Sequence, residues 1–309
     1  MVPQEFAGLR VDQALAKTFP TYSRNRLQAW LEDGRVRVTR GGVVVRVDRS
    51  SAVLGGEVVE LALPTASSQA GHGAQRMALA IVHEDRDLIV VDKPAGLVVH
   101  PGAGNPDRTL MNGLLAHVPA LAQVPRAGIV HRLDKDTSGL LVVAKNLEAQ
   151  ANLAAQLAAR SVKRTYVALV HGEPPAHGLI DAPVGRDARA RTRMAVTRRG
   201  REARTRYRVL ERFGGAGRAP CAMLECRLET GRTHQIRVHL QHIGHPLIGD
   251  PAYRRGAKSG RAFARQALHA AELALVHPRT GKHLAWRAPL PADMKKLLAS
   301  LRREDRDAG

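Results

Sequence analysis

The most informative stretch of this chain is His131-Arg132-Leu133-Asp134-Lys135-Asp136-Thr137-Ser138-Gly139, which runs directly into the apolar segment Leu140-Leu141-Val142-Val143-Ala144. The first part is rich in charged and turn-forming residues, and the second has the composition of a buried strand. The pattern places a carboxylate, Asp134, in a polar turn just ahead of a strand. A lone Asp in such a turn is ordinary turn chemistry, so Asp134 becomes a candidate nucleophile only if the rest of the chain supports a reaction.

The whole nine-residue string resembles the signature of the RluA-type pseudouridine synthases, which isomerise uridine in ribosomal and transfer RNA. The preceding Pro125-Arg126-Ala127-Gly128-Ile129-Val130 is similar to the family's approach to this motif, and the resemblance extends as far as Trp286-Arg287-Ala288-Pro289. It is strongest to the members that act on large-subunit ribosomal RNA. It implies an enzyme with Asp134 as the essential carboxylate and with 23S rRNA, or a large-subunit precursor, as partner. The stem-loop called helix 69, at the subunit interface, is the implied target.

Two further segments match motifs of that family, Lys163-Arg164-Thr165-Tyr166 and Glu229 to Leu240. The resemblance implies that Tyr166 stacks on the target base and moves a proton, that Arg237 pairs with the catalytic carboxylate, and that Ile236 lines the pocket. An opposite charge within about 4 to 6 Å favours an ionised carboxylate. The alternatives are that Tyr166 is a core residue, as strand tyrosines more often are, and that Arg237 is a surface phosphate contact.

Isomerisation of uridine breaks the bond from N1 to the ribose, turns the base and joins C5 to the same sugar carbon. It needs a nucleophile, a proton carrier and walls that retain the loose base, but no cofactor. The reacting atoms are inaccessible inside a stacked helix, so the nucleotide must be flipped out. Arg132 matches the family arginine that fills the vacated space, a role suited to a planar guanidinium. The alternative is a salt bridge from Arg132 to Asp134 or Asp136.

The charge balance points to a polyanionic partner. The 309 residues carry 48 Lys and Arg against 28 Asp and Glu, a net charge of +20, which is typical of a nucleic-acid binder. Aromatic residues are 3% of the chain, too few for a stacking platform, so binding should depend on Arg and Lys. No stretch approaches the roughly 20 apolar residues of a membrane span, and charged residues interrupt residues 1–19. We therefore expect a cytoplasmic protein that binds no membrane.

Residues 1–63 predict a small first domain. Apolar spacing indicates a helix over Leu9 to Phe19 and a second helix capped by Ser23, and strands are expected at Val36–Val38, Val43–Val47 and Val58–Leu63. Two helices and a small sheet resemble the S4 RNA-binding module. The unit carries nine Lys and Arg against seven Asp and Glu, so it holds +2 of the net +20. A local RNA-binding patch would use Lys17, Arg24, Arg26, Arg35 and Arg37, unless these are ordinary solvated charges.

Residues 64–76 have the small, polar composition of a linker, and residues 77–309 predict the catalytic domain. Strands at Ile81–Asp85 and Leu88–Pro94, a helix at Leu147–Ala159 and a closing helix at Ala292–Arg303 are expected, while Ile236–Ile243 has a mixed pattern. Crossover helices do not regularly separate the strands. The fold class is therefore α+β, with a mostly antiparallel mixed sheet.

Ten arginines lie between Gly185 and Arg208, against Asp187 and Glu202 alone. We interpret this stretch as a strand, a loop and a strand that close on RNA, and each phosphate contact should add close to one unit to the salt slope of binding. The candidate contacts are Arg189, Arg191, Arg193, Arg198 and Arg199.

Other classes of function are disfavoured. Cys221 and Cys226 are five apart on a predicted strand and point to opposite faces, and the 14 histidines lack metal-ligand spacing. We therefore expect neither a disulfide nor a metal site. A hydrolase built on Ser138 lacks the Gly-x-Ser-x-Gly turn. The remaining alternative is a noncatalytic RNA-binding factor of ribosome assembly, which would have no use for a carboxylate that repels phosphate. A monomer would suffice for a site built from one chain.

Overall fold

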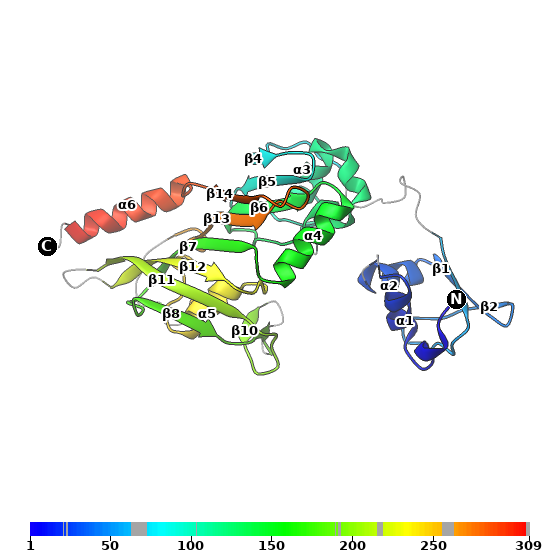
Figure 1. Cartoon of the computed structure of the whole chain (residues 1–309). Helices are drawn as coiled ribbons and strands as arrows, with labels where there is room; N and C mark the ends of the chain where they lie inside the picture. Colours follow the sequence, from blue (N-terminus) through cyan, green and yellow to red (C-terminus); the bar gives the residue numbers. More distant parts are fainter. Residues whose placement is uncertain are drawn as a thin grey trace. The chain divides into compact units, whose positions relative to one another are not determined.

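The computed structural model describes residues 1–306 except 21, 23, 63–72, 103, 189, 191–192, 215–218 and 255–262, and leaves out the side chains of Asn25 and Arg26. The chain divides into two compact units, residues 1–70 and 71–309 (Figure 1). Most of the predicted linker, 64–76, and the predicted cap Ser23 lie outside the described residues. Among the helices that are described, none has both the length and the apolar character needed to cross a membrane.

The first unit is a pair of helices on a small antiparallel sheet. Its elements are η1 (Gln4–Phe6), α1 (Val11–Thr18), α2 (Arg24–Glu32), β1 (Val36–Arg40), β2 (Val43–Val45) and β3 (Val58–Leu61), and the strand order is β2-β1-β3. Leu15, Leu27 and Val38 meet in its core, because the apolar residues recur at helical spacing in α1 and α2 and alternate along β1. The arrangement is consistent with the predicted S4-like module.

A buried carboxylate joins the two helices of this unit. Asp12 in α1 accepts hydrogen bonds from Arg24 Nη2 at 2.7 Å and from Gln28 Nε2 at 2.6 Å, both in α2. Burial by itself raises the pKa of Asp12, but the hydrogen bonds and the charges of Arg24 and Arg10 hold it below its ordinary value. Asp12 therefore stays ionised and fixes the helix pair.

The second unit is built on a large mixed sheet. Its strands are β4 (Ile81–Glu84), β5 (Leu88–Lys93), β6 (Ser138–Ala144), β7 (Lys163–His171), β8 (His177–Asp181), β9 (Val184–Arg186), β10 (Met194–Val196), β11 (Arg204–Phe213), β12 (Cys221–Leu228), β13 (Leu268–Val276) and β14 (His283–Arg287). Its helices are α3 (Leu110–His117), η3 (Pro119–Gln123), η4 (Pro125–Gly128), α4 (Leu147–Ala158), α5 (Gln235–His242) and α6 (Ala292–Arg306). Within the described residues nine strands pair in the order β4-β5-β6-β13-β7-β12-β11-β8, with β14 on β13. Only β6 and β13 pair in parallel, so the predicted, mostly antiparallel mixed sheet is confirmed.

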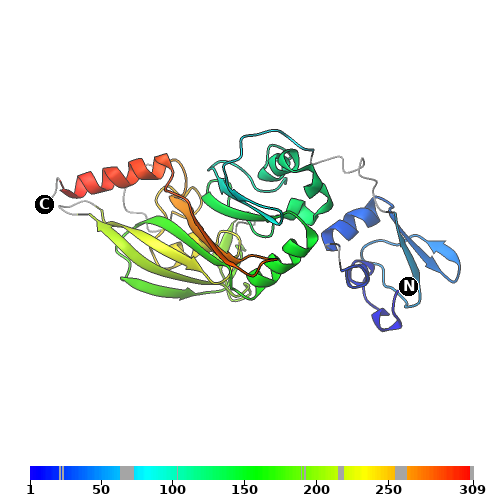
Figure 2. The same ribbon diagram turned by 45° about the horizontal axis from the view of Figure 1, so that its top comes forward.

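Helices cover both faces of this sheet (Figures 1 and 2). On one face α3 and α5 pack over Val91, Tyr166 and Ala168; on the other, α4 packs over β5 and β6 and α6 packs over β7 and β12. Strands covered on both sides must be apolar throughout, and β6 is buried at every residue. The two cysteines of β12 belong to different faces, since Cys226 packs with α5 and Cys221 with α6, and both are free thiols.

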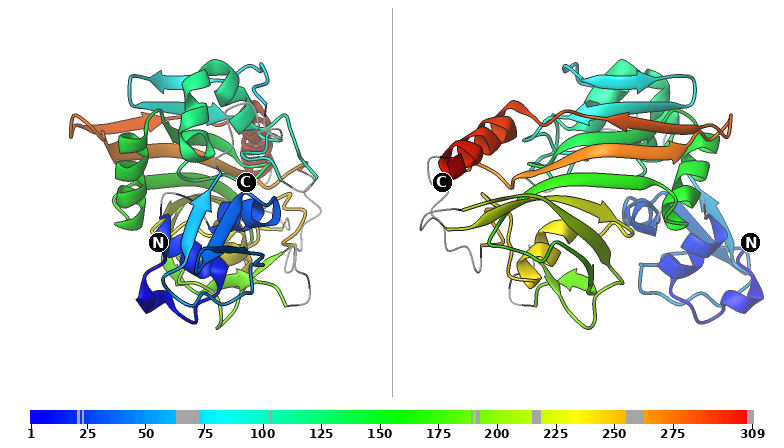
Figure 3. Two further views of the ribbon diagram at one scale, coloured as in Figure 1. Left: turned by 90° about the vertical axis from the view of Figure 1, so that its right-hand side faces the viewer. Right: turned by 60° about the vertical axis from the view of Figure 1, so that its left-hand side comes forward.

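Two features position the candidate site at the start of β6. The backbone of Gly139 approaches β13 so closely that a Cβ there would lie 2.2 Å from the carbonyl oxygen of Ala270, and its φ is +112°. Only glycine accommodates both conditions. The segment with the mixed pattern is helix α5, which lies beside the β9–β10 hairpin (Figure 3). The turn before β6 and the start of α5 therefore face the same cavity.

Candidate active site

Two buried basic side chains hold the main chain of the turn that carries Asp134. The N–H of Thr137 donates to the carbonyl of Asp134 at 3.1 Å, which closes the turn. Lys93 Nζ donates to the carbonyl of Lys135 at 2.9 Å, and Arg265 Nη1 donates to that of Asp136 at 3.0 Å. The main chain on the far side of Asp134 is therefore fixed, and its side chain is left 16% exposed at the cavity.

Arg237 joins Asp134 to a second, fully buried carboxylate. Its Nη1 donates to Asp134 Oδ2 at 3.0 Å, while Nε and Nη2 donate to the two oxygens of Asp250 at 2.7 and 2.9 Å. Burial lowers the pKa of Arg237, but the hydrogen bonds and charges of Asp250 and Asp134 outweigh it and raise the pKa above its ordinary value. Arg237 is thus a permanent cation whose direction is set by Asp250, and it is not a surface phosphate contact, because Nε, Nη1 and Nη2 already donate to the two carboxylates.

His234 lies on the other oxygen of Asp134, with Nε2 at 3.9 Å from Oδ1. It precedes α5 in the left-handed conformation, with φ 56°, and Tyr253 Oη holds its Nδ1 at 2.9 Å. The Tyr253 oxygen already accepts from the N–H of Met194 in β10, so its own hydrogen is available to Nδ1 and Nε2 carries the ring proton. Burial lowers the pKa of His234, so the ring is neutral.

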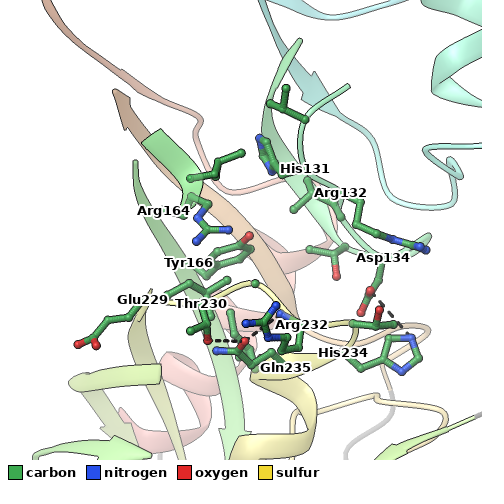
Figure 4. A pocket seen from close by; sticks show the side chains of 18 of the residues that line it. His131, Arg132, Asp134, Arg164, Tyr166, Glu229, Thr230, Arg232, His234 and Gln235 are labelled. Atoms are coloured by element: carbon green, nitrogen blue, oxygen red, sulfur yellow. Dashed lines mark hydrogen bonds and ion pairs between the residues drawn. The ribbon is translucent and has the colours of Figure 1, made fainter. Parts of the chain in front are cut away.

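Asp134 and Tyr166 line one cavity of about 560 Å³, together with Arg132, Ile236 and Arg237 (Figure 4). Tyr166 comes from the middle of β7, and its ring belongs to the core while lining the cavity. Burial and the charge of Asp134 raise the pKa of Tyr166, so its phenol is protonated at neutral pH. The structure thus brings together all five residues that the sequence predicts for the chemistry and the pocket.

Arg132 is exposed at the cavity, and among the described residues it forms no salt bridge with Asp134 or Asp136. The neighbouring His131 is a structural residue, because its Nε2 accepts from the N–H of Val142 at 3.1 Å. Burial, helped by the charge of Arg164, lowers the pKa of His131 to about 3. The cavity therefore presents an ionic pair, a protonated phenol and an exposed guanidinium, a set able to attack, protonate and retain a planar substrate.

Residues 87–242 match the family model described as RNA pseudouridylate synthase. The chain is 52% identical over 97% of its length to a protein of Nitrosomonas europaea and 51% identical over 99% to one of Pseudomonas aeruginosa, covering 87% and 96% of those proteins; both are named ribosomal large subunit pseudouridine synthase D. The chain belongs to the RNA pseudouridylate synthase family. Among solved structures, the pseudouridine synthase is similar to human RNA pseudouridylate synthase domain containing 1, with a TM-score of 0.55 and 28% identity over 73% of this chain and 95% of that one. The sequence-based prediction of an RNA pseudouridine synthase is confirmed.

The candidate RNA contacts of the pseudouridine synthase differ in their surroundings. In the first unit Arg24 is bound to Asp12, whereas Arg35 and Arg37 are 4.0 and 3.7 Å from Asp33 and Glu60 and Lys17 lies over the Phe6 ring. The Arg26 side chain, Arg189 and Arg191 lie outside the described residues. Arg193 lies 5.3 Å from the centre of the Tyr253 ring, while Arg198 and Arg199 are exposed after β10.

Sequence reasoning missed three groups that build this site. Asp250 and Tyr253 fall in a matching segment but carry no motif signal for their bonds to Arg237 and His234, which only the fold creates. Lys93 ends an apolar strand. A charged residue next to a buried apolar run is unusual, and this could have indicated its role. His239 is purely structural, since Thr205 and the carbonyl of Ala182 bind its two nitrogens.

Two other clusters of polar residues do not extend the chemistry. Asp85, Asp87 and His277 are the one group within the described ranges spaced to hold a metal ion. However, His277 Nδ1 accepts from the N–H groups of Arg279 and Thr280, so its Nε2 carries a hydrogen toward Asp85 and offers no lone pair to a metal. Ser138 and His269 are hydrogen-bonded at 2.9 Å but buried in the sheet, which leaves a substrate no access.

Proposed function

We propose that this pseudouridine synthase converts specific uridines of 23S ribosomal RNA to pseudouridine, with the helix 69 stem-loop as its target. The observation that carries the proposal is the near full-length identity of about one half to proteins named for the large ribosomal subunit. The paired carboxylate at the cavity supports the chemistry. The substrate is the rRNA or a large-subunit precursor in the cytoplasm.

In the proposed mechanism Asp134 is the nucleophile. Its carboxylate holds the intermediate formed when the bond between N1 and the ribose breaks, and the uracil turns until C5 faces the same sugar carbon. The new carbon–carbon bond forms, the C5 hydrogen leaves as a proton, N1 takes up a proton, and the carboxylate is released. Nothing is oxidised or hydrolysed, so the reaction needs no cofactor. Arg237 balances the charge of Asp134 throughout, which its fixed geometry against Asp250 supports.

The remaining residues have supporting roles in this proposal. The Tyr166 ring stacks on the base and its phenol handles a proton, Ile236 forms a wall of the pocket, and Arg132 fills the gap that the flipped nucleotide leaves. We assign residues 1–63 to an S4-like RNA-binding domain, 64–76 to a linker and 77–309 to the catalytic domain. The exposed Arg198 and Arg199, with the other candidate basic residues, contact phosphates. A monomer carries the complete site.

Tritium release tests the function and its nucleophile together. The substrate is 23S RNA, or its helix 69 stem-loop, labelled at uridine C5, because joining C5 to the sugar must expel that hydrogen. Wild type is compared with Asp134→Asn, which keeps the shape of the side chain and removes its charge. We expect release by wild type alone, with the RNA affinity of Asp134→Asn retained.

Release by both proteins would remove Asp134 from the nucleophile role. No release by either protein, with tight RNA binding, would instead favour the noncatalytic assembly factor. The position of the pseudouridines in the product RNA checks the choice of helix 69.

A further inference from the structure

One buried cation of the cavity has no partner among the residues that the structure describes. Arg164 lies two residues before Tyr166 on β7, and the two side chains project from the same face of the strand into the cavity (Figure 4). The residue is only 8% exposed. Its Nε is completely buried without a hydrogen-bond partner, and no described residue forms a hydrogen bond or an ion pair with the rest of the guanidinium.

Buried guanidinium groups are normally paired, because removing an uncompensated charge from water is unfavourable. The other two buried arginines described here follow this rule: Arg237 binds Asp134 and Asp250, and Arg265 binds Asp293 at 2.7 Å. Arg164 is the exception among them. Its donors are directed into the cavity and remain available for a ligand with anionic oxygens.

The neighbouring residues leave space for this guanidinium and do not neutralise it. A Cβ at Gly231 would lie 2.8 Å from Arg164 Nη1, so the glycine keeps the path of the side chain open. The nearby His131 is neutral, because burial and the charge of Arg164 lower its pKa to about 3. His131 therefore adds no charge beside the Arg164 guanidinium.

The rim beside Arg164 is also basic. Arg126, Arg201 and Arg232 line the same cavity, as does Arg160, which is paired with Glu202. The described lining contains two carboxylates, Asp134 and Glu229. Asp134 is paired with Arg237 and Glu229 with Arg206 at 2.6 Å. A positive rim that continues inward to an unpaired guanidinium favours a strand of linked phosphates over a single small anion.

We infer that Arg164 binds one phosphate of the RNA strand, next to the uridine whose base lies on Tyr166. Two residues along a strand span about 7 Å, a separation that a base and a phosphate of the same nucleotide can bridge. The planar guanidinium can donate two parallel hydrogen bonds to phosphate oxygens. This contact anchors the backbone while the base is detached and turned. The inference rests on the proposed function for the identity of the bound strand.

The test is a phosphate scan of the stem-loop RNA. Each RNA carries one neutral methylphosphonate near the target uridine, on a 2′-deoxy nucleotide that keeps the linkage stable, and the same deoxy RNA with an ordinary phosphate is its reference. Binding is measured for wild type, Arg164→Gln and Arg302→Gln. Arg302 lies on α6, outside the cavity lining, and is paired with Glu211 of β11. Its variant therefore controls for the loss of one charge.

We expect one linkage at which neutralisation weakens binding about tenfold for wild type and Arg302→Gln, but less than about twofold for Arg164→Gln, since charge-assisted hydrogen bonds are the strong ones. Arg164→Gln should also lower the salt slope by about one unit. Arg164→Lys keeps the charge but loses the two parallel donors of the guanidinium. It should therefore retain the salt slope and bind RNA more weakly than wild type.

The inference is overturned if Arg164→Gln, with a melting temperature like that of wild type, responds to every linkage as wild type does. It is also overturned if the dissociation constant and salt slope are unchanged and only the single-turnover rate falls, because the guanidinium would then act on the uracil. If Arg164→Gln does not fold, an Arg164→Lys variant that binds the unmodified stem-loop as tightly as wild type overturns the inference, because loss of the two parallel donors should weaken binding. Tritium release by wild type decides the proposed function separately, because the scan measures binding alone.

Discussion

Arg237 contacts two carboxylates with different tasks, since Asp250 orients it and Asp134 receives its remaining donor. Lysine cannot reproduce these contacts, because an ammonium lacks the planar set of donors that binds both carboxylates. We expect Arg237→Lys to lower the single-turnover rate by about 100-fold while changing the RNA dissociation constant less than about threefold. Rapid-quench assays and RNA titration measure the two quantities.

The matched control is Arg302→Lys, which alters an exposed guanidinium bound to both oxygens of Glu211. Its rate should equal that of wild type. A rate near wild type for Arg237→Lys would show that one donor to Asp134 is sufficient.

Lys93 is a buried lysine whose Nζ donates to three carbonyls, those of Pro94, Leu97 and Lys135. Burial lowers its pKa to about 7, against the opposing charges of Asp136 and Asp134. Lys93→Met leaves the three acceptors unsatisfied, and we expect a loss of about 2 kcal/mol in the free energy of unfolding at pH 6. Urea unfolding of the second unit measures it.

The same pKa predicts a pH dependence. Between about pH 7 and the ordinary lysine value near 10.4, the unfolded chain binds a proton that the folded chain does not, so this group makes stability rise with pH. The difference between wild type and Lys93→Met should therefore widen above about pH 7. A constant difference up to pH 9 would mean that Lys93 keeps its ordinary pKa.

At this scale the sequence pointed to the candidate reacting groups but not to the residues that position them. Asp134, Tyr166 and Arg237 stand in motifs whose residue types already indicate a role. Asp250 reaches Arg237 across a turn, and the isolation of Arg164 is a property of its burial. Neither can be recognised from spacing along the chain, because both depend on which segments the fold brings together.

Among the elements, the β9–β10 hairpin is connected to the start of α5 through one phenol. Tyr253 Oη joins the N–H of Met194 to His234, which faces Asp134. We expect Tyr253→Phe to lower the free energy of unfolding by about 1 kcal/mol and the single-turnover rate about tenfold, because His234 loses the bond that holds its left-handed backbone.

The control is Tyr207→Phe, which removes a hydroxyl that bonds to no described residue. It should leave the rate unchanged. Equal rates for Tyr253→Phe and wild type at saturating RNA would mean that the hairpin and the catalytic turn are independent.

Asp85 joins the β4–β5 turn to the β13–β14 turn. Its carboxylate binds His83 and His277 at 3.0 and 3.1 Å and accepts from two backbone N–H groups. Burial raises its pKa, but these hydrogen bonds outweigh it and lower the pKa to about 2. A carboxylate with a lowered pKa stabilises the fold at pH values above the unfolded pKa near 3.9. This stabilisation is lost as the pH falls toward 2.

We therefore expect wild type to exceed Asp85→Asn by about 2 kcal/mol in unfolding free energy at pH 6, with the gap closing between about pH 4 and 2. Trp286, whose ring lies 5.3 Å from that of His83, reports the transition by fluorescence in a Trp30→Phe background. Asp107→Asn, at an exposed position, is the control. A gap independent of pH would contradict the low pKa.

Elements with one buried face were predictable, and α5 was not. The amphipathic α1 and α4 follow from their apolar spacing. In α5 every residue from Gln235 to Leu240 is buried, because the helix lies between the sheet and the β9–β10 hairpin. Polar residues that serve the site interrupt the apolar stripe, so the helical period does not show.

For the whole molecule, charge is divided unequally between the two units. Residues 1–70 contain the same nine basic and seven acidic residues as 1–63, so residues 71–309 carry +18 of the +20. We expect deletion of residues 1–70 to weaken selection among RNA sites while leaving turnover on a short, saturating stem-loop within about threefold of wild type, since the deleted unit holds few of the phosphate-binding charges.

Pseudouridine mapping over full-length 23S RNA measures the selection, and tritium release from the stem-loop measures turnover. An equal loss in both assays would place part of the chemistry in the first unit.

The turn that carries Asp134 is completed by residues made long after it. Arg265 binds the carbonyl of Asp136 from 129 residues further along the chain, and β13 follows to pair with β6. At the usual speed of protein synthesis, about 5 to 20 residues per second, the growing chain carries Asp134 for roughly 6 to 26 s before these partners exist. The nascent protein therefore emerges as an inert polypeptide. It becomes an enzyme only after Arg265 and β13 have been synthesised.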